Sequence, residues 1–342
     1  MFYIGLDVHD QYTQIQAMDE AGFLAMTENL PTTAQSLGSF FDQLPGRAVV
    51  SLEAGRNYWW ISQFLNSCST VDDVKVVDPR RNRILSGEYS VRYGYGRAKN
   101  DRIDAEMLAH IHRDGLSPAI HLPSEEQLEW RTLVRHRMGL VQQSTEVGGR
   151  LQGLLSLHGL RLSTRSLVDD FQTQLPSLAS TPAYVLSILH HLVSQIRLYQ
   201  EQIQSCERRL SHCLPSSHPQ IYILMSAPGI GIVLSRIILS EIMSIDYFQT
   251  PKHLMSYTGL APMENTSGGK KGIIELNPYC NYYLKYAFIQ AAHTARFHTK
   301  YRSKYTQDAK RHGKTRAKIN LARRLVKAVY WMLTRQEPFY SE

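Results

Sequence analysis

The chain has 342 residues, of which 43% are hydrophobic, and its formal net charge is +8, so two or three domains with substantial cores are expected. The first residues reach Asp7 and His9 without the apolar stretch of a signal peptide, and no uncharged apolar run attains the roughly 18 residues of a membrane span. The four cysteines form no CxxC pair, so we expect a cytoplasmic protein with no membrane partner, zinc ribbon or disulfide framework.

Residues 1–122 are predicted to form an α/β domain. Apolar and polar residues alternate in 2–8, as in a half-buried strand, and a turn at 19–22 indicates an antiparallel meander. Three strands followed by helix, strand, helix and strand is the element order of the RNase H-like fold. The predicted elements are strands at 2–8, 12–18 and 22–29, a helix at 32–44, a strand at 47–53, a helix at 57–66 and a strand at 74–78.

Four carboxylates have a possible meeting place in that fold. Asp7 lies on the first strand and Glu53 ends the fourth, so the two become neighbours in the sheet. Asp101 and Asp104 share one face of a predicted helix, which would pack across them. Acids also favour a helix N-terminus for its dipole alone, and that remains the simpler explanation of this pair.

Gathered carboxylates would repel one another, and their pKa values would rise without a cation. Oxygen-rich clusters of this kind suit Mg²⁺ or Mn²⁺. Two such ions about 4 Å apart can activate the attacking oxygen and stabilise the leaving one in phosphodiester cleavage. The sequence therefore predicts metal ligands at Asp7, Glu53, Asp101 and Asp104.

Residues 123–217 are predicted to be mainly helical. Ser124 and Gln127 have the spacing of a capping box at a helix start. From Val185 to Leu210, apolar residues recur at alternating steps of four and three, which is typical of a coiled-coil seam. Such a seam could join a dimer or tetramer, although pairing with another helix of the same chain would also satisfy the pattern.

Residues 218–342 are predicted to be helical again, with two interruptions. The turn Pro228–Gly231 between apolar helices resembles a helix-hairpin-helix, in which the backbone N–H groups near Gly229 and Gly231 would approach a DNA phosphate. A tight interhelical turn is the alternative. A loop of small residues follows, and Asn277 and Pro278 are the expected N-cap and first residue of the next helix.

Positive charge is concentrated near the C-terminus. The window 296–327 holds twelve Lys and Arg residues against a single acid, Asp308. Clustered cations with Tyr and His among them are typical of a surface that contacts nucleic-acid phosphates, and a solvated helix face is the alternative. The candidate phosphate-binding residues of this window are Lys314, Arg316 and Lys318.

The order of the motifs "GLDVH", "SLEAG", "KNDRIDA", "APGIG", "YTGLAP" and "TSGGKKG" resembles the DEDD-type insertion-sequence transposases. These are bridge-RNA-guided recombinases related to the Piv-type DNA invertases. The resemblance implies a RuvC-like domain that supplies four acids, a coiled coil for assembly and a C-terminal domain with a nucleophilic serine. It assigns the acids to Asp7, Glu53, Asp101 and Asp104, and the serine to Ser267.

Two local departures from the family pattern lie outside the acids. The family often has Thr or Ser and then Gly soon after the glutamate, where this chain has Ala54 and Gly55. It also often has Lys-Thr-Asp where Asn100 stands between Lys99 and Asp101.

Ser267 is physically plausible as a nucleophile. Its hydroxyl would need a base or metal for activation. The glycines that follow it would let a phosphate approach closely, and Lys270 and Lys271 could neutralise the phosphate. An ordinary Ser-Gly turn without a catalytic role is the alternative. Thr266 and Ser256 are weaker candidates for the nucleophile.

The resulting interpretation is a DNA transposase that cuts and rejoins donor and target DNA through a serine–DNA intermediate. The resemblance further implies a structured noncoding RNA as guide. One alternative is a metal-dependent junction resolvase or nuclease that uses water. Another is a non-catalytic helix-hairpin-helix DNA-binding protein whose acids are structural. The predicted division is an RNase H-like domain at 1–122, a coiled-coil region at 123–217 and a helical transposase domain at 218–342.

Overall fold

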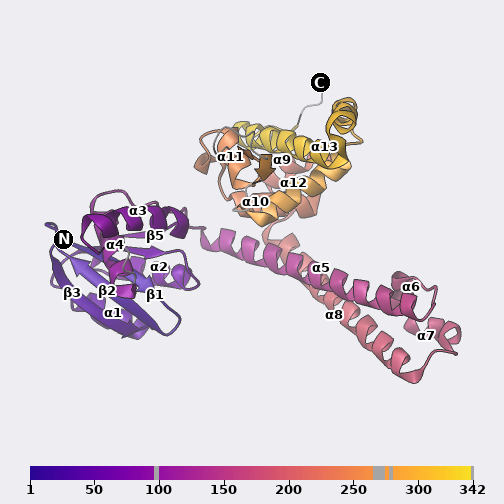
Figure 1. Ribbon diagram of the computed structural model, residues 1–342, viewed down its shortest axis with the longest axis horizontal. Helices are drawn as coiled ribbons and strands as arrows, with labels where there is room; N and C mark the ends of the chain where they lie inside the picture. The colour runs from indigo at the N-terminus through magenta and orange to yellow at the C-terminus, as the bar shows by residue number, and fades with distance from the viewer. Residues whose placement is uncertain (96–99, 265–273, 277–279, 340–342) are drawn as a thin grey trace. The chain divides into compact units, whose positions relative to one another are not determined.

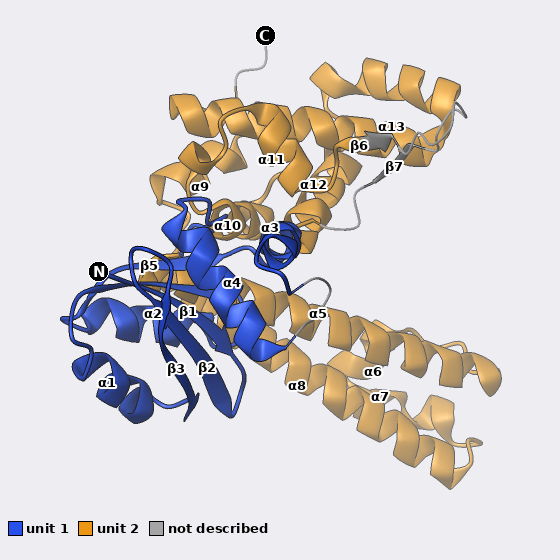
Figure 2. Cartoon of the chain, turned by 60° about the vertical axis from the view of Figure 1, so that its left-hand side comes forward, with its two compact units in different colours: residues 1–122 blue, residues 123–342 orange. Residues whose placement is uncertain are grey.

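The computed structural model describes residues 1–95, 100–264, 274–276 and 280–339. Its internal contacts divide the chain into two compact units, Met1–Leu122 and Pro123–Glu342 (Figures 1 and 2). The first is α/β and the second is almost entirely helical. The further boundary between 217 and 218 stays a prediction.

The first unit is built on a five-stranded mixed sheet with the strand order β3-β2-β1-β4-β5. β1 pairs antiparallel with β2 and β2 with β3, whereas β1–β4 and β4–β5 are parallel. The predicted element order is therefore confirmed, and it is that of an RNase H-like fold. The strands are β1 (Phe2–Val8), β2 (Tyr12–Met18), β3 (Leu24–Pro31), β4 (Ala48–Glu53) and β5 (Val71–Val77).

Helix α4 (Asp101–Arg113) packs directly on the sheet, against β1, β2 and β4 (Figure 2). A Cβ on Gly5 would lie 1.8 Å from the carbonyl oxygen of Ala105, so this close approach requires glycine at position 5. The Ser51 hydroxyl donates a hydrogen bond of 3.0 Å to the carbonyl oxygen of Leu108, which ties α4 to β4. The middle of α4 is thereby fixed against the central strands.

The other helices of this unit are α1 (Ala34–Asp42), α2 (Tyr58–Ser67) and α3 (Pro79–Arg92). Helix α3 was not predicted, because its residues have no continuous apolar stripe. Its start nevertheless carries a signal, since the Asp78 carboxylate accepts from the Arg80 amide and Pro79 occupies the first helical position.

The second unit begins with two long antiparallel helices, α5 (Glu125–Leu157) and α8 (Ala183–Cys213), which pack along each other (Figure 1). The capping box at Ser124 and Gln127 is confirmed, with hydrogen bonds of 3.2 and 3.1 Å. The connection contains α6 (Thr164–Asp169), α7 (Phe171–Gln174) and the short 3₁₀ helix η1 (Leu175–Leu178).

The apolar repeat of α8 is buried within the chain. Val185, Leu189 and Ile196 belong to one buried cluster with Val147 and Leu151 of α5. Packing against another helix of the same chain therefore already removes these apolar side chains from water. Assembly of several chains through this region remains a proposal.

The rest of the second unit is a helical bundle around a core that includes Phe288 and Leu325. Its α12 starts at Tyr282 with Asn281 as N-cap, so the predicted start near Asn277 was wrong. In the described residues, no helix combines the length and apolar character needed to cross a membrane. The elements are α9 (Pro219–Met225), α10 (Ile232–Ile242), η2 (Ile245–Tyr247), α11 (Pro251–Tyr257), β6 (Pro262–Glu264), β7 (Ile274–Leu276), α12 (Tyr282–Ala295) and α13 (Thr299–Arg335).

Candidate active site

The parallel pairing of β1 and β4 brings two of the predicted acids together. Leu6 on β1 is in register with Leu52 on β4, and Asp7 and Glu53 are the next residues along these strands. Side chains at matching positions of adjacent strands lie on the same face of the sheet. The register therefore places Asp7 and Glu53 on adjacent strands, although Glu53 is not in the group of described ligand atoms that lie within 4.8 Å of one another.

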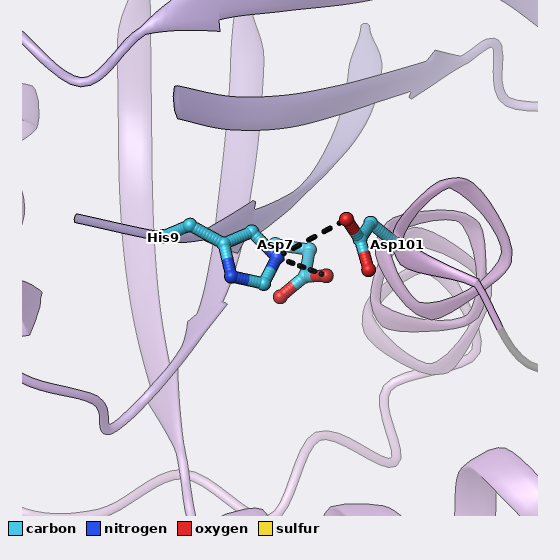
Figure 3. Close-up of side chains that lie close together, drawn as sticks. All are labelled: Asp7, His9 and Asp101. Carbon is cyan, nitrogen blue, oxygen red and sulfur yellow. Dashed lines mark ion pairs between the residues drawn. The ribbon is translucent and has the colours of Figure 1, made fainter. Parts of the chain in front are cut away.

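The other two acids lie in the first turn of α4. The Asn100 side chain caps the helix by accepting a hydrogen bond of 2.9 Å from the amide of Ile103. Asp101 faces Asp7 across the gap between helix and sheet, and its Oδ2 accepts a hydrogen bond of 2.7 Å from the Tyr12 hydroxyl (Figure 3). The cap thus sets the position of the helix start that carries the acids.

His9 is part of this cluster, although the sequence analysis did not select it. Its Nε2 lies 3.3 Å from Asp7 Oδ2 and 3.3 Å from Asp101 Oδ2 (Figure 3). The imidazole ring also packs on the ring of Tyr12, with centroids 4.6 Å apart. The only sequence signal was its place two residues after Asp7, on the same side of an extended chain.

The electrostatics of the cluster are visible at Asp7. Burial raises the pKa of Asp7, and the negative charges of Asp101 and Asp104 raise it further, while His9 opposes them. A raised pKa means that the ionised carboxylate is disfavoured in the protein alone. A bound cation would relieve that cost.

Glu53 has a partner that the sequence analysis also missed. Asn82 on α3 is 2% exposed, and its Nδ2 donates a hydrogen bond of 2.8 Å to Glu53 Oε1. The Oδ1 of Asn82 is buried and has no hydrogen-bond partner among the described residues. This contact fixes the orientation of the Glu53 carboxylate.

The residues present fit a divalent cation. Asp7, His9 and Asp101 each offer a ligand atom, and the three atoms lie within 4.8 Å of one another. Carboxylate oxygens and an imidazole nitrogen are donors that Mn²⁺ and related divalent ions accept. The Nε2 atom of His9 makes no well-directed hydrogen bond to a described residue, so its lone pair is available to bind a cation.

The predicted nucleophile, Ser267, lies outside the described residues, as do its alternative Thr266 and the pair Lys270 and Lys271. The structure describes the strands on either side of this segment. β6 pairs antiparallel with β7, with Glu264 opposite Ile274.

Gly229 and Gly231 differ in their surroundings. Gly229 has a φ of +82°, and a Cβ on it would lie 2.2 Å from the carbonyl oxygen of Ala291 on α12. Gly231 precedes α10, and a Cβ there would meet nothing within 4 Å. Close packing therefore accounts for glycine at 229, and a phosphate-binding role of this turn remains a prediction.

The predicted basic residues lie on α13, after a break in helical geometry at Gly313, where φ is +83°. Lys314 and Arg316 are exposed and Lys318 is half-buried. By contrast, Arg324 pairs with Asp308 at 3.0 Å. Many Lys and Arg side chains of the window 296–327 are exposed to solvent, where a polyanion could contact them.

Two protein-family models match the chain. The DEDD transposase model of the IS110 type matches residues 4–159, which include all four acids. The model described as the transposase IS116/IS110/IS902 family matches residues 221–307, which include Ser267. The chain belongs to the IS110/IS116 family of DEDD transposases.

Individual relatives resemble this transposase over most of their length. The transposase for insertion sequence element IS1111A of Coxiella burnetii is 23% identical, with 98% of this chain and 90% of the relative covered. A probable family 20 transposase of Pseudomonas aeruginosa is also 23% identical, over 84% and 82% of the two chains. The 43.6 kDa protein of insertion element IS110 from Streptomyces coelicolor is 23% identical, over 99% and 95%. The similarity therefore spans both compact units.

Proposed function

We propose that this transposase moves an insertion sequence by cutting and rejoining DNA strands through a serine–DNA intermediate, with Mg²⁺ or Mn²⁺ held by its acids. The observation that carries the proposal is the meeting of Asp7 on β1 with Asp101 in the first turn of α4, with Glu53 next in register on the adjacent strand β4. Residues far apart in the sequence supply this cluster, and the family models cover both the acids and the serine segment.

The acids have separate tasks in this proposal. Asp7 and Asp101 would bind the cation directly, with Asp104 adding negative charge and Glu53 held ready by Asn82. When bound, the cation supplies charge neutralisation and Lewis-acid activation at a phosphodiester. Tyr12 keeps Asp101 oriented toward Asp7 through its hydrogen bond.

Ser267 would perform the covalent step. Its hydroxyl oxygen attacks the phosphorus, a P–Oγ bond forms, the P–O bond to the leaving strand breaks, and that strand departs as a free hydroxyl. Attack by the hydroxyl of another strand on the phosphoserine reverses the step and joins the DNA. Because the bond energy is conserved in the phosphoserine, rejoining needs no external energy source.

The partners of the proposal are donor and target DNA and a structured noncoding guide RNA. Base pairing by such an RNA would leave the protein to grip phosphate backbones, for which the exposed cations of α13 are suited. Assembly as a dimer or tetramer would bring two serines to the two strands of an exchange.

A metal-dependent junction resolvase or nuclease is the second candidate function. It is favoured by one observation: the acid cluster is assembled entirely within residues 1–122, so water could replace the serine as nucleophile. Such an enzyme leaves free ends and cannot reseal them.

The test is to trap the covalent intermediate. A DNA substrate nicked near the crossover, incubated with the complex and divalent cation, should leave protein attached to DNA through a denaturing gel, with the link mapped to 265–271. Ser267→Ala should abolish the adduct while nucleic-acid binding remains. Ser256→Ala, at an exposed serine of α11, is the matched control and should retain the adduct. Strand joining by Ser267→Ala would reject this serine, and cleavage without any adduct would favour the resolvase.

A further inference from the structure

We infer that His9 is a direct ligand of the divalent cation at the Asp7–Asp101 cluster and gives this site a preference for Mn²⁺ over Mg²⁺. The inference rests on the proposed cation site and extends it from a set of four acids to a mixed nitrogen and oxygen site. Its basis is the position of one nitrogen atom, His9 Nε2, between two carboxylates (Figure 3).

The distances suit neighbouring ligands of one ion. Ligands about 2.1–2.2 Å from an octahedral cation lie roughly 3.0–3.1 Å from each other when adjacent. His9 Nε2 lies 3.3 Å from Asp7 Oδ2 and 3.3 Å from Asp101 Oδ2, so movements of a few tenths of an ångström would complete the arrangement. All three donor atoms already fall within 4.8 Å of one another.

The ring is held in this orientation by the fold. The His9 amide donates a hydrogen bond of 2.9 Å to the carbonyl oxygen of Tyr12, which closes the turn between β1 and β2. The Tyr12 ring packs on the imidazole, and the Tyr12 hydroxyl donates to the same Asp101 oxygen that Nε2 approaches. One tyrosine therefore positions both His9 and Asp101.

His9 Nε2 faces two carboxylates without a well-formed hydrogen bond to any described residue. It lies 3.3 Å from an oxygen of Asp7 and 3.3 Å from an oxygen of Asp101. Two carboxylates beside one nitrogen favour a positive charge between them, and a divalent cation bound to all three atoms would supply it.

The donor set determines the preferred ion. Imidazole nitrogen is a better ligand for first-row transition ions than for Mg²⁺, which favours oxygen. With Asp7 and Asp101 supplying charge and His9 supplying nitrogen, Mn²⁺ gains more from this site than Mg²⁺ does. The chemistry of this chain thus differs from that of an all-carboxylate site.

The experiment measures Mn²⁺ bound to the full-length transposase and needs no activity. Pulsed EPR should detect nitrogen coupled to bound Mn²⁺, and protein grown with ¹⁵N-histidine should show the ¹⁵N coupling in its place. His9→Phe keeps a ring to pack on Tyr12 but removes the ligand nitrogen. It should lose the coupling and weaken Mn²⁺ binding by about tenfold or more, with Mg²⁺ affinity changing less than about threefold.

His136→Phe is the matched control, since His136 is exposed on α5 in the other compact unit. It should retain the coupling and the Mn²⁺ affinity, and thermal unfolding should confirm that both variants are folded. Bound Mn²⁺ without histidine coupling, or equal affinity in His9→Phe, would overturn the role of His9. If Asp7→Asn still weakened Mn²⁺ binding in that case, the proposed acid site would stand. No Mn²⁺ binding at all, or binding unchanged in Asp7→Asn, would overturn both.

Discussion

At the residue scale, Asp104 tests whether the carboxylates repel one another in the absence of a cation. Asp104 raises the pKa of Asp7, whose main perturbation is burial, so Asp104→Asn should relieve repulsion. In EDTA the variant should be as stable as the parent or more stable, by up to about 1 kcal/mol. With Mg²⁺ or Mn²⁺, strand cleavage should collapse while DNA binding persists.

Asp10→Asn is the control for this change, because Asp10 is exposed and contacts the side chains of Arg56 and Asn57 at 3.4 Å. It should leave cleavage unaltered. Thermal unfolding in EDTA and a cleavage assay with restored cation give both readouts. Recombination at the normal rate by Asp104→Asn would show that the Asp104 carboxylate is not needed at the cation site.

Tyr89 gives a residue-scale prediction about pH. Its buried hydroxyl donates a hydrogen bond of 2.7 Å to Asp114 Oδ2, and burial together with this bond raises its pKa to about 12. In the unfolded chain Tyr89 ionises near pH 10, so it stabilises the fold fully below about pH 10 and loses that contribution as pH rises toward about 12.

Tyr89→Phe should therefore cost about 1 kcal/mol of unfolding free energy at pH 8, and the difference from the parent should shrink between about pH 10 and 12. Urea titrations at several pH values measure this. Tyr184→Phe, at a tyrosine that is 63% exposed, should follow the parent throughout. A difference that stayed constant with pH would contradict the raised pKa.

The sequence revealed the four acids but not their neighbours. Asp7, Glu53, Asp101 and Asp104 lie within motifs whose order is recognisable, and the element order places Asp7 beside Glu53. The parts of His9, Tyr12 and Asn82 depend on how a turn and an unpredicted helix approach the sheet. Because those approaches are tertiary, local spacing signals neither Tyr12 nor Asn82, and for His9 it gives only the place two residues after Asp7.

At the element scale, prediction succeeded where the pattern had one explanation. Strands β1 and β2 have the predicted bounds. A run of alternating or apolar residues that ends at a turn marks both the type of element and its ends. Helix α3 has no apolar stripe and was missed, and α12 begins at its own Asn281 cap. The apolar repeat of α8 specified burial, but the sequence could not say which helix buries it.

Gly229 and Gly231 form a matched pair for testing the turn between α9 and α10. Gly229→Ala places a methyl group against Ala291 at a φ of +82° and should cost about 2–3 kcal/mol. Gly231→Ala meets open space at a φ of −89° and should cost under about 1 kcal/mol. Chemical denaturation distinguishes them, and equal losses would contradict the packing explanation.

Ile196 and Leu198 separate intrachain packing from assembly. Ile196 is 5% exposed in the α5–α8 core, so Ile196→Asp should destabilise the protein by about 3 kcal/mol or more. Leu198 is 51% exposed on the same helix, so Leu198→Asp should leave unfolding nearly unchanged. Light scattering adds the second readout: a fall in mass for folded Leu198→Asp would place a subunit contact on this face, and an unchanged mass would exclude that position from it.

At the scale of the whole molecule, the distribution of charge matters more than its total. The chain carries +8, yet the window 296–327 alone holds twelve cations and one acid, and α13 presents many of them to solvent. The acid cluster lies in the other compact unit. In the proposed function, the first unit would therefore supply the acids that hold the cation, and the second would supply the phosphate contacts of α13 and the serine.

The salt dependence of binding tests this division. Each phosphate contact contributes about 0.7–0.9 to the slope of log affinity against log salt, because binding releases counterions. Changing Lys314, Arg316 and Lys318 together to Gln should therefore weaken RNA or DNA binding and flatten the slope by up to about 2–3. Fluorescence anisotropy over a salt series measures both quantities.

The matched control removes the same number of charges elsewhere, because a change in net charge alone also weakens binding to a polyanion. Arg150, Arg161 and Arg165 are exposed residues around the α5–α6 connection, and their joint change to Gln lowers the net charge equally. If α13 contacts phosphates, the control should keep the parental slope and lose only a little affinity through the general field. A control slope that fell as far as that of the α13 triple would show that net charge, and not contact at Lys314, Arg316 and Lys318, governs binding. An α13 triple with parental slope and affinity would place that face of the helix in solvent.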